Sequence, residues 1–106
     1  MIVVADTSPL NYLVLIDEID ILRQLFGNLL VPYAVWNELS AQGSPELLKF
    51  WVGTTPAWIK VESPKRLDST IKLGAGEVAA ISLARETGAE LLLVNERLEL
   101  QRSNAD

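Results

Sequence analysis

Four short apolar runs that alternate with helical segments constrain the fold of this chain more than any other feature. Short runs of this kind, mostly rich in leucine or β-branched residues, are typical of strands buried in a sheet. The run at 58–61 alternates only weakly between apolar and polar residues. The order of strand, helices, strand, helices, strand, helix and strand predicts an α/β sandwich with a largely parallel sheet. The runs occupy residues 2–5, 29–31, 58–61 and 91–94.

Capping residues, prolines and glycines predict where the helices begin and end. Asp6 or Ser8 provides an N-cap and Pro9 suits a first helical turn, after which apolar residues recur at helical spacing until Gly27. This stretch is predicted to form one or two helices, and Pro32 is predicted to end the second strand. Polar residues 63–70 are predicted to form a surface connection. Further helices are predicted over residues 33–40, 45–53 and 76–87.

Composition narrows the chemistry that the chain can perform. Its 106 residues, 49% of them hydrophobic, suit one domain over residues 1–106. The absence of cysteine and histidine excludes disulfides, thiolate nucleophiles, Cys-ligated zinc and a histidine base. A net charge of −5 argues against coating nucleic acid through bulk positive charge. Without a basic leader or a long apolar run, we expect a cytoplasmic protein with no membrane span.

Acidic and amide side chains fall where the predicted strands end. Asp6 directly follows the first run, Glu38 lies on the helix after the second, Glu77 opens the helix before the last, and Asn95 and Glu96 follow the last run. In open parallel sheets, ligands gather outside the carboxyl ends of the strands, so these residues are predicted to share one rim. Clustered carboxylates repel unless a cation neutralises them. The pattern therefore predicts Mg²⁺ or Mn²⁺ and hydrolysis of a phosphodiester by metal-activated water.

Each of these residues also has a purely structural interpretation. Asp6 and Ser8 are suitable helix caps, and Glu77 would be favourable in a first turn through the helix dipole alone. Glu38 would suit a solvated helix face. Residues 95–97 would suit a turn. The functional interpretation rests on their convergence at one predicted rim.

Residues 74–79 also satisfy the G-x-G-x-x-A pattern of dinucleotide-binding folds, with Glu96 near the place of a ribose-binding acid. That fingerprint requires a buried strand immediately before its first glycine. Residues 69–73 form a poor strand candidate. We therefore interpret the match as a coincidence.

Four segments in order along the chain resemble PIN domains, and most closely uncharacterised prokaryotic PIN-domain proteins related to VapC toxins. The resemblance covers essentially the whole chain and implies a three-layer α/β/α sandwich with a mainly parallel sheet. The segments are Asp6-Thr7-Ser8 and residues 31–39, 73–81 and 91–97.

The same resemblance implies a ribonuclease that depends on Mg²⁺ or Mn²⁺ and cleaves RNA. Asp6, Glu38 and Glu77 match the first three acidic positions of the family and are expected to be catalytic and to bind metal. Asn95 falls where a fourth acid is usual and is expected to be a further metal ligand. Ser8 and Glu96 are expected to be auxiliary. An antitoxin protein and a second copy of the chain are the implied protein partners.

The chain departs from the family pattern in two places. Asn95 can ligate through its carbonyl oxygen but brings no charge, so weaker metal affinity is expected. Family members normally continue with a helix and a strand beyond the point where this sequence stops, so the fold is expected to lack those elements. Both departures leave open a second interpretation, a non-catalytic or decayed PIN-like binding module.

Overall fold

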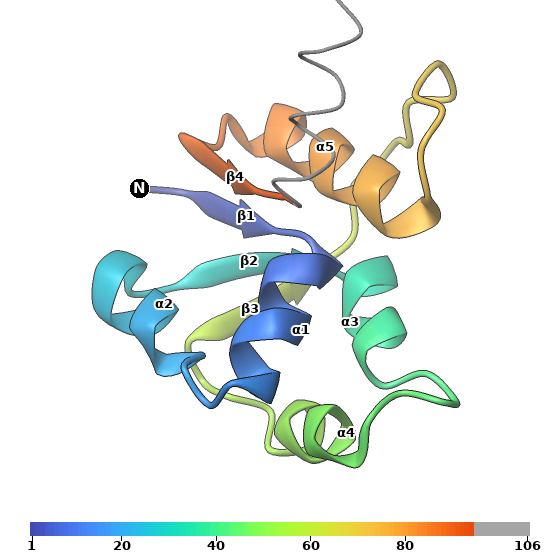
Figure 1. The fold of residues 1–106 in the computed structure, drawn as a ribbon. Coiled ribbons are helices and arrows are strands. Elements are labelled where there is room, and N and C mark those ends of the chain that lie inside the picture. Colours follow the sequence, from blue (N-terminus) through green and yellow to red (C-terminus); the bar gives the residue numbers. More distant parts are fainter. Residues whose placement is uncertain (95–106) are drawn as a thin grey trace, which may run out of the picture.

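The computed structural model describes residues 1–94 and contains a four-stranded parallel sheet in the order β3-β2-β1-β4 (Figure 1). Val4 of β1 pairs with Leu30 of β2 and Leu92 of β4, and every strand pairing is parallel. The elements are β1 (Val3–Ala5), α1 (Thr7–Leu15), α2 (Asp20–Phe26), β2 (Leu29–Pro32), α3 (Tyr33–Leu39), α4 (Glu46–Gly53), β3 (Ile59–Glu62), α5 (Ala75–Thr87) and β4 (Leu91–Leu93).

Helices cover the two faces of the sheet unequally. Side chains along a strand alternate between faces, so Val3 and Ala5 of β1 join one apolar cluster while Val4 joins another. The larger cluster contains buried residues of α1, α2, α3 and α4. The smaller cluster contains Ala80 and Leu83 of α5. The chain therefore forms the expected three layers, with α5 packed against β1, β2 and β4 on its own face.

Local sequence signals account for several of the helix boundaries. Asp6 is the N-cap of α1, and its carboxylate accepts a hydrogen bond from the Thr7 backbone N–H. Gly27 and Gly88 follow α2 and α5 with φ angles of 78° and 67°, which glycine adopts without steric cost. The stretch predicted as one or two helices forms two. Asp17, with a φ of 60°, lies in the left-handed region that interrupts the helix between them.

Every strand differs from its predicted bounds by one residue, at the start of β1, at the ends of β2 and β4, and at both ends of β3. Pro32 is the last residue of β2 rather than a residue beyond it, and it pairs with Glu62. Its φ of −61° and ψ of 146° are compatible with an extended strand end. The third strand begins at Ile59, while the carbonyl of Trp58 still accepts a hydrogen bond from the Leu29 N–H at 2.9 Å.

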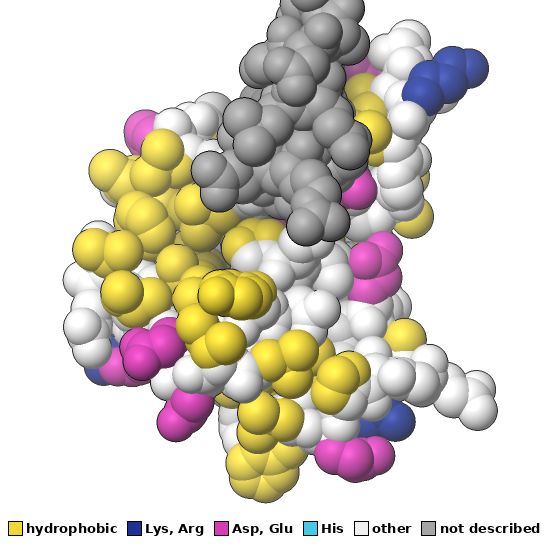
Figure 2. Space-filling view, viewed as in Figure 1, with side chains coloured by type: hydrophobic (Ala, Val, Ile, Leu, Met, Phe, Trp, Pro, Cys, Tyr) yellow, Lys and Arg dark blue, Asp and Glu magenta, His cyan; other side chains and the backbone are white. Residues whose placement is uncertain are grey.

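The outer surface of the larger helical layer carries many apolar side chains. Figure 2 shows them gathered over α1, α2 and α4, away from α5. None of the helices described in residues 1–94 has the length and apolar character needed to cross a membrane. The large apolar residues exposed on these three helices, together with Ile16 just after α1, are Tyr12, Leu15, Ile21, Leu25, Leu47 and Phe50.

Candidate functional site

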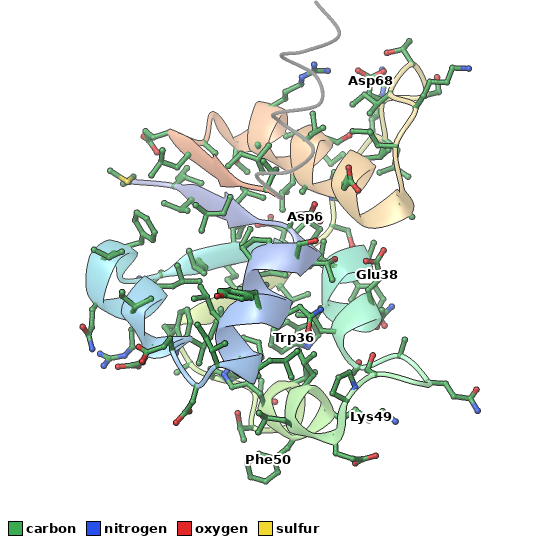
Figure 3. The ribbon with its side chains drawn as sticks, in the orientation of Figure 1. Asp6, Trp36, Glu38, Lys49, Phe50 and Asp68 are labelled. Carbon is green, nitrogen blue, oxygen red and sulfur yellow. The ribbon has the colours of Figure 1, made fainter. Side chains whose placement is uncertain are left out.

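Three carboxylates that are distant in the sequence line one cavity at the carboxyl ends of β1 and β2. Asp6 directly follows β1, Glu38 lies on α3 immediately after β2, and Glu77 lies in the first turn of α5. Figure 3 shows Asp6 and Glu38 at neighbouring positions. The cavity has a volume of about 170 Å³ and is lined by Asp6, Thr7, Ser8, Glu38, Gly74, Gly76 and Glu77.

Asp6 is the most buried of the three acids, with 2% of its surface exposed. Burial raises the pKa of its carboxyl above the ordinary value, and the nearby charges of Glu77 and Glu38 raise it further. The hydrogen bond from the Thr7 N–H, 2.7 Å long, opposes this shift only in part. Asp6 therefore caps α1 and also lines the cavity, so the structural and functional interpretations of this residue are compatible.

Glu38 is exposed, yet its carboxylate has two close neighbours. The Thr7 hydroxyl donates a hydrogen bond to Glu38 Oε2 at 2.7 Å. The second neighbour is Gly76 of α5. A Cβ placed on Gly76 would lie only 2.8 Å from Glu38 Oε1. The packing of α3 against α5 brings these groups together. The position of Glu38 in the cavity thus depends on both helices that flank it.

Glu77 lies where α5 begins and where the helix dipole favours a negative charge. Its Oε1 would be 3.9 Å from a Cβ on Gly74, the N-cap residue of the helix. A carboxylate at this position is stabilised locally, although its charge raises the pKa of Asp6. Dipole stabilisation and a functional role are again compatible.

Comparison with known proteins places the chain in a family. A family model described as DUF3368, PIN domain, matches residues 2–105. The chain belongs to this PIN-domain family. Neither the curated proteins nor the solved structures contain a match. The family, together with the parallel sheet and five helices of residues 1–94, agrees with the α/β architecture predicted from the sequence.

Membership supports a nuclease-type fold, and PIN domains in general use divalent metals and act on nucleic acids. The donor atoms around the cavity of this PIN domain are carboxylate and hydroxyl oxygens, which suit Mg²⁺ or Mn²⁺ rather than a soft metal. In residues 1–94, however, no three acidic side chains converge closely enough to form a complete metal site. The oxygen donors that line the cavity would suit a hydrated ion, which keeps several waters and needs few direct protein ligands.

The predicted site residues of the PIN domain divide into two groups. Asp6, Glu38 and Glu77 line the cavity together with Ser8, whereas Asn95 and Glu96 lie outside the described residues. Sequence reasoning did not single out Thr7, which contacts two of the acids. The position of Thr7, next to Asp6 and in the first turn of a predicted helix, could have indicated that it lies at the site.

The dinucleotide-binding alternative lacks the strand that it requires. Within the described part of the chain, β3 ends at Glu62 and no strand lies between it and Gly74. The Gly74 to Ala79 segment instead forms the start of α5, where Gly76 adjoins Glu38. Both glycines line the acidic cavity, and Gly76 leaves room for the Glu38 carboxylate.

Proposed function

We propose that this PIN domain is a metal-dependent ribonuclease that hydrolyses RNA phosphodiester bonds, like the VapC toxins that its sequence resembles. The observation that carries the proposal is that Asp6, Glu38 and Glu77, from three separate parts of the chain, line one cavity. The raised pKa of Asp6 supports it, because a bound cation would offset the burial and like-charge repulsion that raise this pKa.

In this proposal Asp6, Glu38 and Glu77 hold Mg²⁺ or Mn²⁺, with Asn95 as a further ligand and Ser8 and Glu96 as auxiliary residues. When bound, the ion supplies a Lewis acid that polarises the phosphate and lowers the pKa of an attacking water. Asp6 is the fixed ligand, because its carboxylate is buried and held by the Thr7 N–H. The ionised carboxylates accept hydrogen bonds and protons from the attacking water but donate none.

Cleavage of a labelled, structured RNA tests the proposal directly. We expect the purified protein to cleave with Mg²⁺ or Mn²⁺ and not with a chelator, and we expect Glu77→Gln to abolish cleavage by removing a charged ligand. Glu46→Gln is a matched control, because Glu46 occupies the first turn of α4 as Glu77 does that of α5, but its side chain is 93% exposed and outside the cavity. Equal cleavage by wild type and Glu77→Gln would indicate a contaminating nuclease.

A non-catalytic or decayed PIN-like binding module is the second candidate. It is favoured by the lack of three converging acidic side chains in residues 1–94. A folded wild-type protein that binds no Mn²⁺ and cleaves no RNA would support this module over the ribonuclease.

An antitoxin protein and a second copy of the chain are the proposed protein partners, and the cytoplasm is the proposed location. These proposals rest on the resemblance to VapC-related proteins. Light scattering on the purified chain would test the second copy, since a homodimer doubles the measured mass. Co-purification of the product of a neighbouring gene, together with inhibition of RNA cleavage by that product, would test the antitoxin.

A further inference from the structure

Thr7 contacts two of the three cavity acids at the same time. Its backbone N–H donates to Asp6 Oδ1 at 2.7 Å, and its hydroxyl donates to Glu38 Oε2 at 2.7 Å. Thr7 and Glu38 are separated by 31 residues, so only the packed fold brings them together. We propose that Thr7 is a positioning residue that holds the Glu38 carboxylate beside Asp6 in the orientation that receives a divalent cation. This inference rests on the proposed function of the cavity.

Glu38 needs such a contact because nothing in its own helix fixes its carboxylate. The side chain is exposed on α3 and has several rotatable bonds, and holding it in one rotamer costs conformational entropy. The negative charge of Asp6 also favours rotamers that carry the Glu38 carboxylate away, because like charges repel. The Thr7 hydroxyl opposes both effects. Its direction is restricted, since β-branching limits χ1.

Gly76 confines the same carboxylate from α5. A Cβ at this position would lie 2.8 Å from Glu38 Oε1 and 3.1 Å from Oε2. The space at Gly76 is therefore occupied by the end of the Glu38 side chain. Thr7 bonds Oε2 of the carboxylate, and Oε1 lies nearest the position that a Cβ on Gly76 would take, so the two residues together restrict its position.

The hydrogen bond from Thr7 to Glu38 has an alternative explanation, in which it only joins α1 to α3 and stabilises the fold. The two explanations differ in what removal of the hydroxyl changes. A purely structural bond affects unfolding and leaves the intrinsic affinity of the folded protein for metal unaltered. A positioning bond affects metal affinity in protein that is fully folded.

Calorimetric titration with Mn²⁺ of the full chain separates these explanations without relying on catalysis. Thr7→Val removes the donor at nearly constant volume and is expected to weaken Mn²⁺ affinity about 10- to 100-fold, the range observed when partners of metal ligands are lost. Thr7→Ser retains the hydroxyl and is expected to keep most of the affinity. RNA cleavage measured in parallel should fall in kcat for Thr7→Val and recover with Thr7→Ser. Thermal unfolding in chelator identifies the folded fraction of each variant.

Two further variants make the test specific to Glu38. Gly76→Ala would place a methyl group where the Glu38 carboxylate lies, and the flexible side chain would swing away while alanine maintains the helix. It should fold and lose Mn²⁺ affinity like Thr7→Val. In a Glu38→Ala background, which removes the acceptor altogether, Thr7→Val should cause little additional loss, because both changes act through the same carboxylate.

Each outcome supports or overturns the proposal. Wild-type Mn²⁺ affinity in folded Thr7→Val, or an equal loss with and without the Glu38 carboxylate, would overturn the role of Thr7 while leaving the ribonuclease intact. A wild-type protein that neither binds Mn²⁺ nor cleaves RNA would overturn the proposed function, and the positioning role with it.

Discussion

Two aspartates near opposite ends of α5 have contrasting surroundings (Figure 3). Asp6 lies in the cavity at the start of the helix, where burial and the charges of Glu77 and Glu38 raise its pKa. Asp68 lies on the connection that leads into α5, where hydrogen bonds from Thr70 and then Arg85 lower its pKa. The contrast distinguishes polar groups that stabilise the fold from polar groups whose arrangement suits a ligand.

The connection around Asp68 is attached to α5 by complementary contacts. The Lys65 and Arg66 N–H groups donate to Glu86 Oε2 at 2.7 and 3.2 Å, and the Asp68 N–H donates to the buried Ser82 hydroxyl at 3.2 Å. Each of these hydrogen bonds thus pairs a backbone N–H donor with a side-chain oxygen of α5. The acidic side chains of this region therefore face donors and a cation, whereas in the cavity the charges of Glu77 and Glu38 lie near the like charge of Asp6.

The largest expected effect is that of Asp6→Asn. We expect RNA cleavage to fall by about a hundredfold or more. Loss of a residue that only hydrogen-bonds a metal ligand typically costs about 10- to 100-fold, and loss of the ligand itself should cost at least as much. We also expect the metal-free protein to be more stable, because the amide keeps the acceptor for the Thr7 N–H without a buried charge. Cleavage assays and thermal unfolding in chelator at neutral pH measure both. A variant that is less stable and fully active would remove the distinction between the two regions.

A smaller effect is expected in the complementary region, from Ser82→Ala. The change leaves the Asp68 N–H without its acceptor inside the contact between the connection and α5. The free energy of unfolding should fall by about 1 to 2 kcal/mol, and cleavage by the folded protein should be unchanged. Urea denaturation and the RNA assay test the two halves of this prediction. A loss of cleavage in the folded protein would show that the connection also controls the cavity.

The smallest effects are expected in the pH dependence of stability, and their signs should be opposite. Because the pKa of Asp6 is raised, its protonated form stabilises the fold, and that contribution is lost as pH rises from the ordinary aspartate pKa through the raised one. Because the pKa of Asp68 is lowered, its contribution is present above the ordinary pKa and is lost as pH falls through the lowered one.

These contributions can be measured by thermal unfolding in chelator from acid to neutral pH. The variants Asp6→Asn and Asp68→Asn are compared with wild type. Both variants should approach wild type in acid. Toward neutral pH, Asp6→Asn should become more stable than wild type and Asp68→Asn less stable. Shifts of the same sign would contradict the contrast between the two aspartates.

Much of the fold could be predicted because its signals are local. The apolar run before Asp6, Pro9 in a first turn and the glycines after α2 and α5 each act within a few residues. Two of the boundaries that differed, at Pro32 and Ile59, depend on pairing between β2 and β3, which is a contact between distant segments. The three cavity acids were also predictable, because parallel strands carry their following residues to one edge of the sheet.

The sequence by itself determined the parallel α/β order, the starts of α1, α3, α4 and α5 to within a residue, and the shared edge for Asp6, Glu38 and Glu77. These features follow from residue types and their spacing. Only the tertiary structure decided that Asp6 is buried, that Thr7 bonds Glu38, and that Gly76 adjoins the same carboxylate. Burial and side-chain contacts depend on how closely α1, α3 and α5 pack at the end of the sheet. That packing distance is the sum of many interactions across the chain, so no local pattern encodes it.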